Sequence, residues 1–177
     1  ESRKNILEYD EVISVQREMI YAARNKVMSA SPDFMEDIIR QSVKNTIDSF
    51  SSKKANLNRN DLIDFIYNNI AYNFDASSID QDITEYNKKS VSEYLSKIIS
   101  NQINTLHSVI PDSFQQLYFK RIVVLKAVDT MWIEQSDNLQ QLKAIVNGRS
   151  WGQHRPIYEF QIEARRSFFE MKEEIWL

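Results

Sequence analysis

The stretch LKAVDTMWIEQSDNLQQLKAIVNGRSWGQHRP, residues 125–156, decides the fold of this chain. Apolar residues recur in it every seven positions, with two more at alternate positions: Leu125, Trp132, Leu139 and Val146, with Val128 and Leu142. Gln135 is the polar residue on this seam. A seven-residue spacing gives a stripe along a helix that packs lengthwise against other helices. The pattern predicts a helix that starts at Asp112 or Ser113 and runs for ~30 residues or more, about 45 Å.

Both glycines of the chain, Gly148 and Gly152, lie at the end of this stretch. Gly148 suits the end of a helix and Pro156 the first turn of the next one. Further apolar residues then mark an amphipathic helix to the end of the chain: Phe160, Ala164, Phe168, Met171 and Ile175. Residues 112–177 are therefore predicted to form an antiparallel helical hairpin with a tip at 147–156.

Residues 2–30 contain no glycine or proline and carry a similar stripe: Ile6, Ile13, Ile20 and Val27, with Tyr9, Gln16 and Ala23 between them. We expect one long helix that packs along the hairpin. Gln16 and Gln135 are each a large polar residue on an apolar seam. Amides in such positions fix the register of neighbouring helices, so we expect both to lie near helix–helix contacts.

The middle of the chain reads as several shorter helices inserted between the long helix and the hairpin. We predict them at about 33–50, with Asp33 as a cap, at about 61–70, and at about 84–109, with a turn-prone segment at 73–82. The predicted fold is all-α, and its three parts are residues 1–31, 32–111 and 112–177.

Composition supports long helices and excludes several classes of function. The 177 residues include two glycines and three prolines, few for a fold with many turns. The net charge of −3 argues against a nucleic-acid binder. The lack of cysteine excludes disulfides and thiolate metal sites. No apolar run approaches the ~20 residues that span a bilayer.

Catalytic motifs are also missing from the sequence. The histidines, His107 and His154, have no metal-ligand spacing around them, so we expect no metal site. No Gly-rich phosphate-binding motif occurs, so we expect no nucleotide site and no enzymatic activity in this chain alone.

Trp151 is the strongest functional candidate, because it is a large aromatic residue close to Gly148 and Gly152 at the predicted tip. It either contacts a partner or folds back onto the hairpin, and the residues alone leave both open. Arg149 and Arg155 flank it and could contact acidic groups or remain solvated. On the helix before the tip, we expect Trp132 to be a core residue. We expect Asp129 to pair with an arginine, with Arg17 or Arg166 as candidates.

Residues 3–12, RKNILEYDEV, and residues 125–132, LKAVDTMW, begin two blocks of sequence that resemble the SecA family of protein translocase motors. Residues 3–12, RKNILEYDEV, followed by Gln16-Arg17 and Tyr21, resemble the family pattern R-K-x-L-L-E-Y-D-D-V at the start of its scaffold helix. Residues 125–132 resemble L-x-x-x-D-x-x-W. Residues 139–142, 149–153, Pro156 and Glu159-Phe160 resemble the tip R-G-Y-x-Q-x-D-P-x-x-E-Y and the second finger helix.

This resemblance implies an architecture and a role. Residues 1–31 and 112–177 would be the helical scaffold with its two-helix finger, and residues 32–111 the helical wing. The fingertip residues Arg149, Ser150, Trp151 and Gly152 would contact an unfolded preprotein and the SecY channel. The motor domains of the same chain would bind ATP and Mg²⁺. The whole protein would be cytoplasmic, peripheral at the inner face of a bacterial membrane.

Departures from the family pattern favour an accessory, second SecA of a Gram-positive bacterium. Trp151 stands where a tyrosine is common, and Gln135 and Ser136 replace a His-Leu pair. The first residue is Glu1 and the last are Ile175-Trp176-Leu177, so we expect a fragment of a longer protein. The alternative from another functional class is a free-standing adaptor that binds partner helices in a groove.

Overall fold

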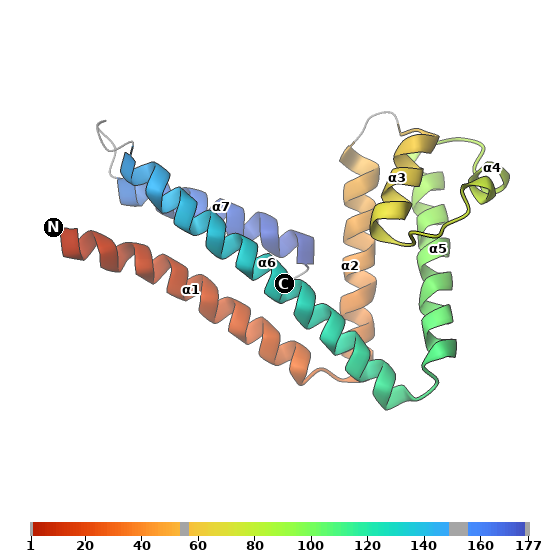
Figure 1. Ribbon diagram of the computed structural model, residues 1–177, viewed down its shortest axis with the longest axis horizontal. Helices are drawn as coiled ribbons and strands as arrows, with labels where there is room; N and C mark the ends of the chain where they lie inside the picture. The colour runs from red at the N-terminus through yellow and green to blue at the C-terminus, as the bar shows by residue number, and fades with distance from the viewer. Residues whose placement is uncertain (1, 54–56, 149–155, 176–177) are drawn as a thin grey trace. The chain divides into compact units, whose positions relative to one another are not determined.

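The computed structural model describes residues 2–53, 57–148 and 156–175. All regular secondary structure in these ranges is helical, which confirms the predicted all-α class (Figure 1). The helices are α1 (Ser2–Met28), α2 (Pro32–Lys53), α3 (Arg59–Asn69), α4 (Ile79–Asp82), α5 (Lys88–Val109), α6 (Ser113–Gly148) and α7 (Pro156–Ile175), and η1 (Ala76–Ser78) is a short 3-10 helix.

Local chemistry explains where these helices begin. The backbone N–H of Gln115 donates to the Asp112 carboxylate at 2.8 Å, so Asp112 caps α6 as expected. Pro156 is the first residue of α7, also as expected. The expected cap at Asp33 is wrong. Ser31 caps α2 instead, because its hydroxyl accepts a hydrogen bond from the N–H of Phe34 at 3.2 Å. Pro32 is the first residue of α2, and proline suits this position because an N–H there would have no partner within the helix.

Contacts divide the chain into two compact units. Unit 1 comprises Glu1–Ile38 and Leu117–Leu177, and unit 2 comprises Ile39–Gln116.

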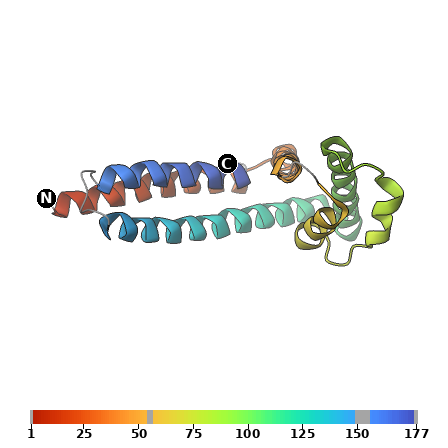
Figure 2. The same cartoon turned by 90° about the horizontal axis from the view of Figure 1, so that it is seen from above.

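Unit 1 is built on three long helices, α1, α6 and α7, that lie side by side (Figures 1 and 2). Contacts between α1 and α6 join Tyr9 to Asn147 and Arg24 to Asp129, so these two helices run antiparallel. Tyr9 contacts Phe160 and Ile20 packs with Phe168, so α1 and α7 run parallel. The predicted seams are largely buried, but Ile6 is 49% exposed and does not belong to the core.

At the other end of unit 1, the first turns of α2 pack against α6. Met35 and Ile38 are buried in one cluster with Val27 and Ala30, and Leu125 of α6 packs against it. Lys120 of α6 is 7% exposed and forms an ion pair with Glu36 of α2. Arg121 donates to the backbone carbonyl of Ala30. A lysine this buried needs such a partner, because an unpaired buried charge is strongly destabilising.

Unit 2 has its own core, which α2, α3, α4 and α5 share. Its buried residues are Ile47, Leu62, Ile66, Ile79, Ile83, Val91, Tyr94 and Leu95. The rings of Phe50 and Phe65 stack at 4.1 Å. The helices of unit 2 differ from expectation in two places. The segment 73–82 is not all turn, since it contains η1 and α4, and the helix expected from about residue 84 begins at Lys88, where Asn87 accepts from the N–H of Ser90.

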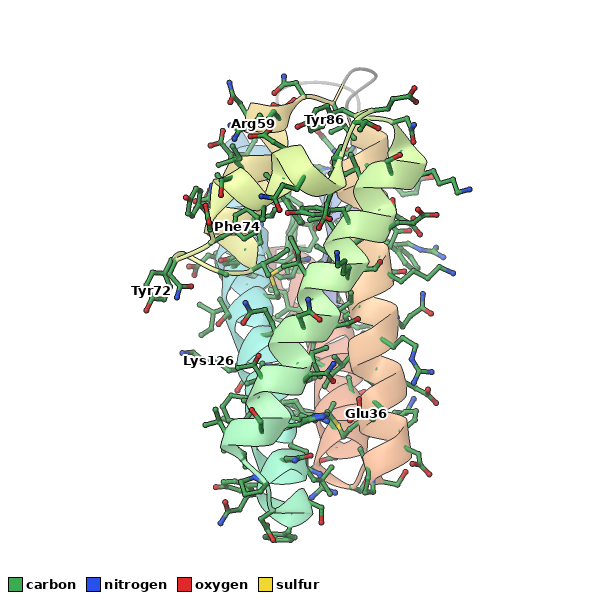
Figure 3. The ribbon with its side chains drawn as sticks, turned by 90° about the vertical axis from the view of Figure 1, so that its right-hand side faces the viewer. Glu36, Arg59, Tyr72, Phe74, Tyr86 and Lys126 are labelled. Atoms are coloured by element: carbon green, nitrogen blue, oxygen red, sulfur yellow. The ribbon has the colours of Figure 1, made fainter. Side chains whose placement is uncertain are left out.

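An ion pair joins the first residue of α3 to α4 in unit 2. Arg59 donates from Nε and an Nη to the two carboxylate oxygens of Asp80, at 2.7 and 2.9 Å. This hydrogen bond lowers the pKa of Asp80 below its ordinary value, because it favours the ionised carboxylate. On the same unit Tyr72 is 88% exposed and projects away from the helices (Figure 3).

Candidate functional site

The predicted fingertip residues Arg149, Ser150, Trp151 and Gly152 lie outside the described residues, as do His154 and Arg155. The structure describes the two helices that this segment joins, α6 and α7, and the helix that packs against both, α1. The candidate site is therefore built from the three helices that hold the connection between residues 148 and 156.

Tyr9 joins α1 to the last turn of α6. Its hydroxyl donates to Oδ1 of Asn147 at 3.0 Å, one residue before Gly148. Lys143 of α6 lies over the Tyr9 ring, with Nζ 5.3 Å from the centroid, and 3.5 Å from Oδ1 of Asp10. Burial raises the pKa of the Tyr9 hydroxyl, so it stays a hydrogen-bond donor at neutral pH.

The same tyrosine packs against the start of α7. The Tyr9 and Phe160 rings meet edge to face at 4.9 Å, a favoured aromatic geometry. Around them lies a buried cluster that all three helices supply: Ile13, Leu139, Val146 and Ala164. The sequence placed Tyr9 on the α1 seam, but its bond to Asn147 was not foreseen. The sequence did contain a signal for this bond. Tyr9 places a hydroxyl on an otherwise apolar stripe, and a buried tyrosine hydroxyl usually has a hydrogen-bond partner.

Half-way along the bundle, the two seam glutamines meet, which confirms that they lie at helix contacts. Nε2 of Gln135 donates to Oε1 of Gln16 at 3.0 Å and to Oγ of Ser167 at 2.9 Å. Nε2 of Gln16 donates to the carbonyl of Ala164 at 2.9 Å. Gln16 and Gln135 are 5% and 2% exposed. These bonds tie α1, α6 and α7 at one level, and an axial slide of any one helix would leave buried amides unpaired.

Further along, Arg24 of α1 pairs with Asp129 of α6. The expectation that Arg17 or Arg166 holds this aspartate is wrong. Arg17 is exposed, and Arg166 pairs within α7 with Glu163 and Glu170. Arg24 lies eight positions after Gln16, about two helical turns, and Asp129 lies six before Gln135, so the pair follows from the antiparallel register of α1 and α6.

Trp132 lies half-buried against the next core cluster of unit 1, in agreement with its expected packing role. That cluster consists of Ile20, Val128, Phe168 and Met171, and it again takes residues from α1, α6 and α7. The three helices are therefore joined at successive levels by the Tyr9 contacts, the glutamine network, and the apolar cluster beside the Arg24–Asp129 pair.

The described part of the chain holds no group of His, Asp or Glu side chains placed to bind a metal ion. None of its helices is both long and apolar enough to cross a membrane. The contacts described at this site are packing and hydrogen bonds, and they join α1 to both helices that flank residues 149–155.

Comparison with known proteins gives one consistent family. The family described as SecA Wing and Scaffold domain matches residues 1–177. A Protein translocase subunit SecA 2 of Pediococcus pentosaceus is 38% identical over 176 residues, which cover 99% of this chain and 22% of the relative. The proteins of the same name from Staphylococcus epidermidis and Streptococcus agalactiae are 36% and 31% identical, and each match covers 98% of this chain.

The chain spans about a fifth of the length of these relatives. The relatives carry the name SecA 2, in agreement with the expected resemblance to an accessory SecA. The family match extends over the whole chain, including the middle region where sequence motifs gave no evidence of their own. This chain belongs to the SecA family, as a wing and scaffold domain homologous to those of SecA 2 protein translocase subunits.

Proposed function

We propose that this chain is the scaffold, wing and two-helix finger of an accessory SecA-type motor for protein export. Residues 1–31 and 112–177 are assigned as the scaffold with its finger, and residues 32–111 as the wing. ATP-driven movement of motor domains elsewhere in the same protein passes through α1 to α6 and α7. These helices move the fingertip, Arg149 to Gly152, against an unfolded preprotein and a SecY-type channel. The protein works on the cytoplasmic side of the bacterial membrane, as a peripheral component.

The observation that carries this proposal is the bonding of α1 to both helices that flank the fingertip segment. Tyr9 contacts Asn147 of α6 and Phe160 of α7, and Gln16 bonds to both helices through Gln135 and Ala164. A displacement of α1 is therefore passed to α6 and α7 together. With 27 residues, α1 is roughly 40 Å long, and a packed helix of that length resists bending.

Binding of ATP and Mg²⁺ is assigned to the motor domains rather than to this chain. The sequence has no glycine-rich phosphate loop, and its two glycines, Gly148 and Gly152, are too few to build one. The alternative from the sequence was a free-standing adaptor. The relatives do not support it, because the matched region makes up only about a fifth of their length.

Replacing Trp151 with alanine in the translocase subunit that carries this chain tests the fingertip. An aromatic anchor at a contact contributes enough that its loss lowers export roughly tenfold or more. The measurement is the rate of export of a substrate of the accessory system, at equal amounts of the variant and the parent subunit.

The matched control is Tyr72→Ala, which removes an exposed aromatic residue from unit 2. Export by this variant is expected to equal that of the parent. Normal export by Trp151→Ala would refute the fingertip contact, and an equal loss in both variants would point to a general effect of removing surface aromatics.

A further inference from the structure

A groove runs between α1 and α7 on the side of unit 1 that faces away from α6. Met19, Ala22 and Ala23 line it on α1, and Lys26 and Lys172 stand at one end. Its floor is formed by Ile20 and Phe168, which are 1% and 4% exposed. The same two residues pack on Val128 of α6, so α6 occupies the opposite side of the α1–α7 pair.

The groove suits a macromolecular partner better than a small molecule. Its volume is about 200 Å³, below the roughly 300–1,000 Å³ of pockets that enclose small ligands. Exposed apolar residues extend it along both helices. Val15, Met19 and Ala22 share one face of α1 by their spacing of four and three, and Phe169 lies one turn before Lys172 on α7. A shallow groove between two parallel helices, continued by exposed apolar side chains, is a geometry that receives a third helix.

The rim of this groove is positively charged. Lys26 of α1 and Lys172 of α7 line the groove, and Arg165 lies seven positions before Lys172 on the same face of α7. Arg165 lies over the ring of Phe169, 5.6 Å from its centroid, and Lys172 lies 5.9 Å from that of Phe168. Among the described residues, no carboxylate forms an ion pair with any of these three cations. By contrast Arg166, the residue after Arg165, forms ion pairs with Glu163 and Glu170. The rim therefore presents three cations beside an apolar floor.

We propose that the α1–α7 groove is a docking site for an amphipathic helix of a partner protein that carries carboxylates beside its apolar stripe. The apolar stripe covers Met19, Ala22 and Phe169, and the carboxylates pair with Lys26, Arg165 and Lys172. A fourth helix in this position completes a four-helix bundle around Ile20 and Phe168. This docking site does not depend on the fingertip contacts proposed above.

The probe is a fluorescently labelled peptide of about 18 residues, long enough to form a helix when bound. It carries leucine along one face and glutamate on both flanks, and the control peptide has lysine in place of each glutamate. Binding to this chain is measured by fluorescence anisotropy. The glutamate peptide is expected to bind roughly tenfold more tightly than the lysine peptide, and to weaken as salt screens the charges.

Charge reversal locates the site. In the double variant Lys26→Glu, Lys172→Glu, the preference for the glutamate peptide is expected to be lost or inverted. The control Lys126→Glu makes the same change at an exposed lysine of α6 (labelled in Figure 3) and is expected to bind like the parent. Equal binding of both peptides, absence of binding, or a preference that survives the double variant would overturn the proposal. A second test needs no variant. If added salt does not weaken binding of the glutamate peptide to the unaltered chain, the proposal is also overturned.

Two further outcomes would assign the groove to another occupant. If the longer translocase subunit fails to bind the glutamate peptide while this chain binds it, the subunit fills its own groove, and the partner-protein proposal is wrong. If light scattering shows a dimer that the peptide dissociates, the occupant is a second copy of the chain, which equally overturns it. Equal binding by the chain and the longer subunit, with the chain monomeric, supports the proposal.

Discussion

Replacing Phe160 with alanine is expected to lower the free energy of unfolding of unit 1 by about 3–5 kcal/mol. The Phe160 side chain is fully buried between α1, α6 and α7, and its ring packs edge to face on Tyr9 at 4.9 Å. Its removal leaves a cavity among Ile13, Leu139 and Val146 that rigid helices fill poorly. A domain is stable by only about 5–15 kcal/mol, so a large part of the stability of unit 1 is lost.

The measurement is urea denaturation followed by tryptophan fluorescence. Trp132 is half-buried in unit 1, and residues 39–116 of unit 2 contain no tryptophan, so the signal reports on unit 1 and not on unit 2. The matched control is Phe169→Ala on the same helix, where the ring is half exposed and the loss is expected to be about 1 kcal/mol or less. Similar losses in the two variants would contradict the packing described for α7.

Replacing Gln135 with leucine is expected to lower the free energy of unfolding of unit 1 by about 1–3 kcal/mol, because the side-chain oxygens of Gln16 and Ser167 lose a hydrogen-bond donor. Nε2 of Gln135 serves both Oε1 of Gln16 and Oγ of Ser167. The Gln16 amide is 5% exposed, so water replaces the lost bond poorly. Leucine itself fits an apolar seam, so the loss comes from the partner left behind and not from the new side chain.

The double variant Gln16→Leu, Gln135→Leu separates these causes. Replacing both partners of a buried polar pair with apolar groups is often nearly neutral, so the double variant should recover most of the stability lost in Gln135→Leu. Urea denaturation of the parent, both single variants and the double variant gives the coupling between the two residues, expected at about 1 kcal/mol or more. Additive losses would show that the amides act separately.

The sequence predicted much of unit 1 because its helices follow a regular spacing. The stripes on residues 2–30 and 125–146 each contain one glutamine, and apolar stripes of this kind pack face to face. Two such glutamines on facing seams must lie at a helix contact, and they do. The start of α7 was equally predictable, since Pro156 follows a glycine-containing segment and suits the first helical turn.

Contacts that depend on register or on long-range packing could not be predicted from spacing alone. Arg24 reaches Asp129 because of the axial alignment of α1 with α6, which the stripes do not specify to within a turn. The docking of Met35 and Ile38 against α6, and the bond from Arg59 to Asp80 across 21 positions, carry no periodic signal. The fingertip residues were identified by resemblance to a family, and their contacts remain a prediction.

Site-specific crosslinking from position 151 tests the central claim most directly. A photoreactive residue replaces Trp151 in the translocase subunit that carries this chain, with channel-containing membranes, ATP and an export substrate stalled in transit. We expect crosslinks to the moving polypeptide or to the SecY-type channel, and none from the same residue placed at Tyr72. Normal transport without any crosslink from position 151 would contradict the proposed fingertip contact, because Trp151 would then be a packing residue.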